Sequence, residues 1–273
     1  MKKTVLLFIL ISTVLAVCAQ QPSQKEQKKM RKEIGLPDNF VYIPQGDSSF
    51  WMLKTEVTNE MIFQMLRQLK IDNSEELINS IKKKFYENYF LGSIRESEDT
   101  SFFMKNYPVA NIADFFADLY CKYLNTTLLD TSWEYRLPTK DEWIYAAKAG
   151  NNMPYAWSCP FLYSQDGKRM CNFLEVGEES IHRNNNGELE ILLDPKLSRN
   201  KYLRIQPVII YSPNDWGLYN MCGNVAEMVL EKGIAVGGSC GDPGFDVQIN
   251  STQVYNGTSP KVGFRPILAK KKK

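Results

Sequence analysis

The stretch from Asp215 to Glu227 gathers polar oxygens around a glycine. Asn220 and Glu227 each carry side-chain oxygens, and Gly223 between them permits a backbone conformation that turns carbonyl oxygens inward. Hard oxygen donors of this kind suit calcium. The structural alternative is a Gly-Asn turn that follows a buried aromatic segment. Spacing alone leaves both interpretations open.

A second set of polar residues lies nearer the carboxyl terminus. Ser239, Asp242 and Arg265 supply a hydroxyl, a carboxylate and a guanidinium, which together could act on a polar substrate. His182 is the only histidine in the chain, and this excludes any site that needs two or three imidazoles. Nothing in the sequence supports pairing it with Cys240 as a protease dyad.

Six motifs occur in an order typical of one protein family. They are Lys54-Thr-Glu-Val-Thr-Asn59, Pro108-Val-Ala-Asn-Ile112, Tyr135-Arg-Leu-Pro-Thr-Lys-Asp-Glu-Trp143, Gly217-Leu-Tyr-Asn-Met-Cys-Gly-Asn-Val-Ala-Glu227, Gly237-Gly-Ser239 and Gly263-Phe-Arg265. Through them the chain resembles the sulfatase-modifying factor family, named after the formylglycine-generating enzyme. The resemblance spans about residues 40 to 268. It implies one α+β domain of the C-type-lectin-like kind, with short strands, several helices and much irregular structure.

The resemblance also implies calcium at the first stretch. The family's ligands match here position by position, as the side chains of Asn220 and Glu227 and the carbonyls of Gly223 and Val225. We therefore expect one occupied Ca²⁺ site.

A second calcium site of the family maps onto this chain less well. Its ligands would be Asn172, Phe173, Asn200 and Tyr202. Asn200 stands where the family has an aspartate, so the charge that would hold the ion is missing. We expect this second site to be the weaker of the two.

The oxidase chemistry of the family depends on two cysteines, three and eight positions after the serine of the Gly-Gly-Ser element, which bind copper. This chain has Asp242 and Val247 there. Cys240 directly follows Ser239, and one thiolate cannot supply the two-sulfur site that Cu(I) prefers. We therefore expect neither copper binding nor the oxidase reaction.

Three functions remain open. The first is a non-catalytic, calcium-stabilised domain that binds an envelope protein, a secreted protein or a glycan; the block from Phe50 to Asn59 resembles family members associated with gliding motility and protein secretion. The second is an enzyme of altered chemistry that uses Ser239, Asp242 and Arg265 in the family's cleft. The third is an oxidase that pairs Cys240 with a thiol from elsewhere. We favour the first.

The amino terminus predicts export from a bacterial cell. A basic start precedes an apolar run from Val5 to Val17, and small residues follow where a signal peptidase reads, so residues 1–19 form a predicted signal peptide. Leu15-Ala-Val-Cys18 resembles a lipoprotein box, although Val17 departs from it, and lipidation of Cys18 is the alternative to cleavage before Gln20. We expect the periplasm or cell envelope, and no transmembrane helix in the mature chain.

Composition fits a folded, nearly neutral mature domain. Of 273 residues, 44% are apolar and 12% aromatic, which is typical of a globular chain. Loss of Lys2 and Lys3 with the leader takes the net charge from +2 to 0, so electrostatics give no reason to expect nucleic acid binding. Five cysteines remain. Cys159 and Cys171 could close a short loop in an oxidising compartment, and the sequence pairs none of the others.

The chain divides into a polar linker over 20–38, the domain over 39–269 with a helical insertion at 70–106, and a basic tail at 270–273. Helices are predicted to begin after Thr58, at Ser74 and after a Thr-x-x-Glu capping box at Thr139. A further helix is predicted from Asp114 to Asn125, with Phe115 facing inward. Arg136 and Glu142 are interpreted as an ion pair or cap rather than as catalysts.

Overall fold

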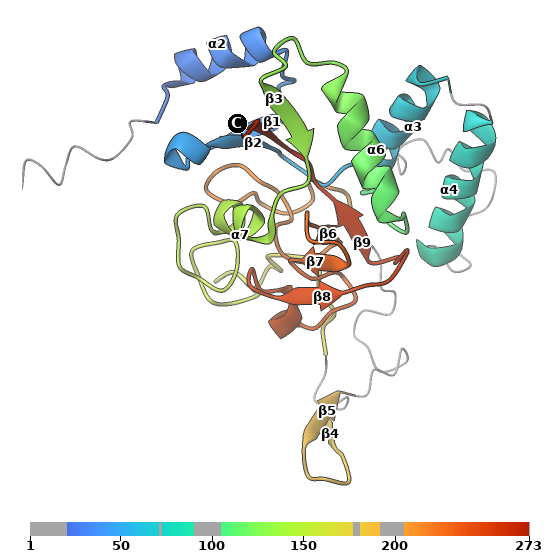
Figure 1. Ribbon diagram of the computed structural model, residues 1–273. Helices are drawn as coiled ribbons and strands as arrows, with labels where there is room; N and C mark the ends of the chain where they lie inside the picture. Colours follow the sequence, from blue (N-terminus) through green and yellow to red (C-terminus); the bar gives the residue numbers. More distant parts are fainter. Residues whose placement is uncertain (1–20, 71–72, 90–104, 177–180, 192–204, 273) are drawn as a thin grey trace, which may run out of the picture.

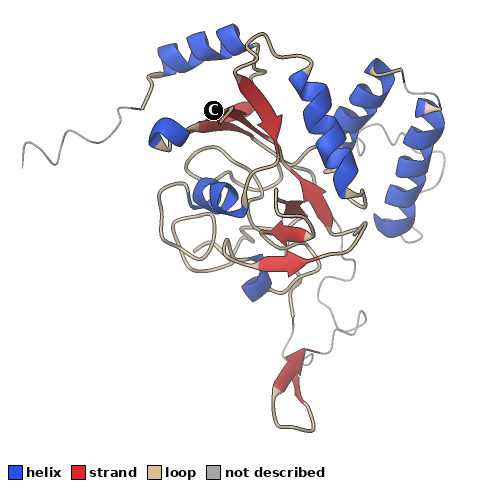
Figure 2. Ribbon diagram, in the orientation of Figure 1, coloured by secondary structure: helices blue, strands red, loops and turns tan. Residues whose placement is uncertain are grey.

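Two small sheets, a group of helices and long irregular segments make up the domain (Figure 2). The computed structural model describes residues 21–70, 73–89, 105–176, 181–191 and 205–272. Short strands joined by irregular chain confirm the predicted α+β class.

The first sheet brings together the two ends of the domain (Figure 1). Across the sheet it contains, all antiparallel, β1 (Phe40–Ile43), β2 (Phe50–Leu53), β10 (Ile267–Lys270) and β3 (Trp133–Arg136). Along β2, Trp51 and Leu53 join one apolar cluster, whereas Phe50 and Met52 join another. Strand β2 is therefore buried on both faces and lies between two cores.

The second sheet places a carboxylate beside a guanidinium. Its order is β8 (Thr252–Val254), β7 (Ile234–Val236), β6 (Ala226–Met228) and β9 (Val262–Phe264). Strands β6 and β9 run parallel, with Glu227 opposite Gly263. Arg265 directly follows β9, so this pairing brings it close to Glu227. Strands β4 (Ile181–Arg183) and β5 (Leu189–Ile191) form a separate hairpin, and 3-10 turns cover Gly46–Ser48 and Gly244–Val247.

Four helices begin where the sequence predicts, including the one that starts at Ser74. In α3 (Asn59–Gln68) the Thr58 side chain accepts from the amide of Met61, and α7 (Lys140–Lys148) has the predicted capping box between Thr139 and Glu142. Helix α6 covers the predicted range, Asp114–Asn125. The prediction that Phe115 faces inward is wrong, because this residue is 60% exposed. It lies in the first turn of α6, where the helix passes the edge of the core.

The segment predicted as a polar linker instead contains a helix. Helix α2 (Gln24–Ile34) starts at a capping box between Ser23 and Glu26. Ile34 and Leu36 are buried in the first apolar cluster, and the guanidinium of Arg31 lies 4.5 Å from the centre of the Trp51 ring. Its charged residues face water while a few apolar ones hold the helix on the domain.

The predicted insertion contains a helix, and the predicted basic tail begins inside a strand. Helix α4 (Ser74–Tyr89) packs on α3 through buried Ile78, and the Lys82 ammonium lies 5.7 Å from the Phe63 ring centre. The sequence predicts that the tail begins at Lys270, but this residue belongs to β10 and pairs with Trp133. The sheet therefore extends one residue further than expected.

Some predictions fall outside the described residues. These concern the signal peptide, Cys18, Asn200 and Tyr202. Within the described part of the chain, no helix is both long and apolar enough to cross a membrane.

Candidate functional site, a buried polar centre

The Asn220 to Glu227 stretch forms a tight turn before β6. Asn220, Gly223 and Asn224 all have positive φ angles, of 52°, 74° and 64°. Asparagine tolerates this conformation, and glycine adopts it without strain. A Cβ added to Gly223 would lie 2.2 Å from the carbonyl oxygen of Asn172, so a side chain is also excluded by contact. The turn interpretation is thus correct for the backbone, and it leaves the role of the side-chain oxygens open.

Glu227 and Arg265 form an ion pair with almost no exposure to solvent. The Nη2 atom of Arg265 lies 2.6 Å from Oε1 of Glu227, Nε lies 3.0 Å from Oε2, and the two side chains are 0% and 1% exposed. The indole Nε1 of Trp143 donates to Oε2 of Glu227 at 2.8 Å. Both oxygens of this carboxylate therefore already accept hydrogen bonds.

The rest of the Arg265 guanidinium holds three chain segments together. Nη1 donates to the carbonyls of Leu53 and Lys54, at 3.2 and 2.8 Å, and Nη2 donates to the carbonyl of Tyr219 at 2.7 Å. Arg265 thus links the end of β2 to the turn that carries Asn220. Its hydrogen bonds give it a structural role.

Glu56 completes the centre, although sequence reasoning did not single it out. It is fully buried in the segment between β2 and α3. The Nδ2 atoms of Asn220 and Asn224 donate to its carboxylate, at 3.1 and 2.8 Å. Burial raises the pKa of Glu56 to about 7, with Arg265 opposing the rise and Glu227 adding to it. We call Glu56, Asn220, Asn224, Glu227 and Arg265 the buried polar centre.

One acceptor in the buried polar centre has no donor within the described part of the chain. Oδ1 of Asn220 is buried and makes no hydrogen bond there, while Nδ2 of the same amide is turned toward Glu56. Oδ1 of Asn224, by contrast, accepts from Asn172 Nδ2 at 3.1 Å and from the amide of Gln206 at 2.8 Å. A buried oxygen without a donor is costly unless a water molecule or a cation meets it.

The buried polar centre has oxygen ligands and carboxylates that fit a hard cation. With both carboxylates ionised, Glu56, Glu227 and Arg265 sum to a charge of −1, and Asn220 Oδ1 needs a partner. In the described part of the chain no three His, Cys, Asp or Glu side chains are grouped to hold a metal. A cation here would depend on Asn220 and backbone oxygens, and on a carboxylate that it shares with Arg265.

Of the four ligands predicted for the second calcium site, the structure describes Asn172 and Phe173, which lie next to the turn that carries the first site. Asn172 and Gly223 form a parallel backbone bridge, and the carbonyl of Asn172 accepts from the amide of Asn224 at 2.8 Å. The carbonyl of Phe173 accepts from Nη2 of Arg169, whose guanidinium also lies 4.5 Å from the Phe173 ring centre. The Phe173 carbonyl, a predicted calcium ligand, therefore already accepts a hydrogen bond from a guanidinium.

The three candidate catalytic residues are not brought together as one group. Oγ of Ser239 donates to Oδ2 of Asp242 at 2.5 Å, and the Ser239 amide donates to the same oxygen at 2.8 Å. Nε2 of Gln253 and Nζ of Lys261 also contact the Asp242 carboxylate. We call these four residues the Ser239 corner. Arg265 instead donates to Glu227 of the buried polar centre and to the neighbouring carbonyls of Leu53, Lys54 and Tyr219.

The Ser239 corner borders an open hollow of about 570 Å³. Asp242, Gln253 and Lys261 line it beside two exposed apolar side chains, Phe245 and Val254. Val247, in contrast, is fully buried and packs against Gly238, where a Cβ would come within 2.8 Å of the Val247 backbone.

Other candidate residues have structural surroundings. The Arg136 guanidinium makes two hydrogen bonds of 2.7 Å to Glu142, which confirms the predicted ion pair and cap. His182 is exposed in β4. Burial raises the pKa of the Cys240 thiol to about 12, so its reactive thiolate form is disfavoured.

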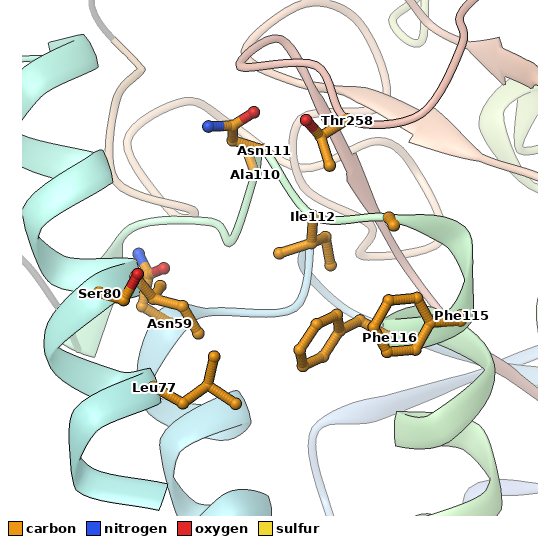
Figure 3. A pocket seen from close by; sticks show the side chains of 11 residues that line it. Asn59, Leu77, Ser80, Ala110, Asn111, Ile112, Phe115, Phe116 and Thr258 are labelled. Atoms are coloured by element: carbon orange, nitrogen blue, oxygen red, sulfur yellow. The ribbon is translucent and has the colours of Figure 1, made fainter. Parts of the chain in front are cut away.

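A smaller hollow of about 160 Å³ lies between α4 and α6 (Figure 3). Leu77 of α4 and Phe116 of α6 face it, and Asn59 and Asn111 are among its few polar side chains. It is separate from both polar groups described above, and none of the candidate site residues lines it.

Comparisons with known proteins agree with this architecture. A family model described as "Sulfatase-modifying factor enzyme 1-like domain" matches residues 24–267. No curated protein matches the chain. Among solved structures, CarF is similar at 18% identity with a TM-score of 0.54, over 86% of this chain and 99% of that one.

Two further solved structures are similar at 16% identity. Treponema denticola variable protein 1 has a TM-score of 0.48 over 85% of this chain and 92% of its own. PvdO from Pseudomonas aeruginosa has a TM-score of 0.44 over 85% of this chain and 90% of its own. At such identities the likeness to CarF concerns the fold alone.

Proposed function

Because the chain belongs to the sulfatase-modifying factor family, whose domain model matches residues 24–267, we propose that it is a non-catalytic, calcium-stabilised binding domain. It is exported to the bacterial periplasm or cell envelope and serves secretion, gliding or envelope assembly by binding a protein or a glycan. The observation that carries this proposal is the buried polar centre, where Asn220 Oδ1 lacks a donor among the described residues and lies in a region with two buried carboxylates.

Support for a non-catalytic role comes from the two positions that hold copper-binding cysteines in the family's oxidases. The carboxylate of Asp242 accepts the hydrogen bonds from Ser239 and Gln253 in the Ser239 corner. Val247 is part of the second apolar cluster. Each residue has a structural task at its position, and neither supplies the soft sulfur ligand that copper prefers.

Support for calcium comes from the match between ligand chemistry and the unsatisfied group. The ion would be held by Asn220 and Glu227 side chains and the Gly223 and Val225 carbonyls, and when bound it would supply a positive charge to a region with two buried carboxylates. The carboxylate of Glu56 accepts hydrogen bonds from Nδ2 of Asn220 and so fixes the orientation of this amide, which leaves Oδ1 of Asn220 for the ion. Glu56 is therefore a positioning residue.

Support for binding comes from the hollow beside the Ser239 corner. Phe245 and Val254 are exposed there, next to the polar side chains of Gln253 and Lys261. Exposed apolar groups bordered by polar ones are typical of a surface that contacts a partner.

The alternative function is an enzyme of altered chemistry at the same hollow. It is favoured by the short contact between Ser239 Oγ and the Asp242 carboxylate. In such an enzyme Asp242 would hold the serine proton, and Lys261 rather than Arg265 would face the substrate. Turnover of a small ester or amide that is lost in Ser239→Ala would favour this alternative over the binding domain.

The calcium part of the proposal is tested by thermal unfolding with calcium and with chelator. Calcium that binds the folded form alone raises the melting temperature, by roughly 5–10 °C at a hundredfold excess over its Kd. Asn220→Gly keeps a residue that accepts the positive φ and removes Oδ1. We expect this variant to lose the calcium-dependent rise.

Asn224→Gly is the matched control. Residue 224 also has a positive φ, and its replacement also removes a hydrogen-bond donor to Glu56. In the wild type, however, Oδ1 of Asn224 already accepts hydrogen bonds from Asn172 and Gln206. We expect this variant to be less stable overall and to keep the rise. An equal rise in wild type and Asn220→Gly, or no rise in wild type, would contradict calcium at this centre.

A further inference from the structure

Two of the cysteines lie opposite each other in the fold. The parallel bridge between Asn172 and Gly223 places the preceding residues, Cys171 and Cys222, on neighbouring segments at matching positions. Neighbouring strands lie about 4.8 Å apart. This spacing is within the range of roughly 4.4–6.8 Å between Cα atoms that a disulfide requires.

The surroundings of the two thiols agree with this pairing. Both are buried in the same apolar cluster, with Tyr155 and Phe173. Each is 2% exposed, and both are free thiols in this structure. The other buried thiols have different charged neighbours, which are Asp118 and Lys232 for Cys121, and Lys261 and Asp242 for Cys240.

Cys159 is a poorer partner for Cys171 than the sequence suggests. Although a short loop separates them in the chain, Cys159 is partly exposed and its Sγ lies 3.8 Å from the carbonyl oxygen of Phe161. It lines a different hollow, with Phe161 and Tyr163.

We propose that Cys171 and Cys222 form a disulfide that joins the Asn172 segment to the turn carrying Asn220 and Gly223. The bond would hold together the two chain segments that meet at the buried polar centre. It depends on the proposed export only for the source of the oxidant, and it does not depend on calcium.

The oxidant is a disulfide, and the reaction is thiol–disulfide exchange. One cysteine thiolate attacks the oxidant, forms a mixed disulfide and releases one thiol; the second cysteine then attacks the protein sulfur of that mixed disulfide and releases the other thiol. Two cysteine thiols are oxidised, the oxidant is reduced, and both protons end on the released thiols. Because both side chains are buried in the folded domain, out of reach of a dissolved disulfide, the bond forms during folding, before the core closes.

The test is peptide mapping of the mature chain refolded in a mixture of reduced and oxidised glutathione. Remaining thiols are alkylated under denaturing conditions, and the protein is digested with trypsin without reduction. Lysine and arginine residues separate all five cysteines into different tryptic peptides. We expect a linked peptide that contains Cys171 and Cys222, lighter by two hydrogen atoms than its two parts, which a reductant separates.

Two variants sharpen this result. Cys159→Ala should retain the linked peptide, whereas Cys171→Ala should leave Cys222 alkylated. Oxidised wild type should also melt several degrees above the reduced form, because the bond closes a long loop. Alkylation of both Cys171 and Cys222 in refolded wild type, or a peptide that links Cys171 to Cys159, would overturn the proposal; the wild-type map decides even if a variant fails to fold.

Discussion

The buried polar centre and the Ser239 corner are two carboxylate sites built on the same Gly237-Gly238-Ser239 element. The carbonyl of Gly237 accepts from the amide of Gly223 in the turn of the buried polar centre, at 2.8 Å. Two residues later, Ser239 donates twice to Asp242. The two sites differ in access to water: Glu227 is 1% exposed, whereas the Asp242 side chain is 16% exposed.

This difference explains why the two carboxylates have different partners. Away from water an ion must be matched in charge and fully hydrogen-bonded, so Glu227 is held by Arg265 and Trp143. Asp242 borders an open hollow where water can replace a lost partner. The unsatisfied acceptor, Asn220 Oδ1, lies in the dry site, where its cost is highest. The dry site is therefore the one that gains most from an added ion.

The largest expected effect is the loss of the buried guanidinium. Arg265→Met leaves two buried carboxylates without their cation, and we expect a loss of about 3–5 kcal/mol in the free energy of unfolding, measured with urea. Arg136→Met is the control, since the Arg136–Glu142 pair is 21% and 18% exposed. There we expect about 1–2 kcal/mol. Equal losses would mean that burial does not set the strength of the two pairs.

The next effect is a pH dependence that comes from Glu56. Its pKa is raised from 4.5 to about 7, so the folded state binds the proton more tightly than the unfolded chain. The resulting stabilisation is complete below about pH 4.5 and is lost as the pH rises through 7, a change of about 3 kcal/mol. In chelator, wild type should show this loss and Glu56→Gln should not.

Glu142→Gln is the control for that pH profile. Burial acts to raise the Glu142 pKa, but hydrogen bonds from Arg136 and Thr139 outweigh it and the pKa is lowered. Its contribution therefore has the opposite sign, being present above the unfolded pKa and lost as the pH falls. A profile for Glu56→Gln that still declines between pH 4.5 and 7 would rule out Glu56 as the titrating group.

The smallest effect is expected at the Ser239 corner. Asp242→Ala removes the carboxylate that accepts two hydrogen bonds from Ser239 and one from Gln253. Because water reaches the site, we expect a loss of only about 1–2 kcal/mol in the free energy of unfolding. The calcium-dependent rise in melting temperature should be unchanged. A rise that disappears in this variant would show that the two sites act as one.

Local signals in the sequence were sufficient for much of the fold. The caps at Thr58 and Thr139 satisfy amides within three residues of themselves, so their pattern can be found without knowing the rest of the structure. The same holds for the bounds of α6. The family motifs supplied the fold class that local patterns could not, whereas no motif predicts the parallel pairing of β6 with β9.

Contacts between distant residues could not be derived in this way. Glu56 meets Asn220 across 164 residues of sequence, and a lone glutamate next to Val57 carries no local sign of full burial. The linker prediction failed for a related reason. The charged composition of 20–38 suggested solvated chain, while the contacts that hold α2 come from Ile34 and from Arg31 on Trp51 of a later strand.

Helix α2 also sets the height at which a lipid anchor would hold the domain. Ser23 already belongs to its capping box, and only residues 19–22 separate it from Cys18. Even fully extended, that distance is at most about 18 Å, well under the thickness of a bilayer. An acylated Cys18 would thus hold the first turn of α2, and with it the side of the domain that α2 covers, within that distance of its anchor.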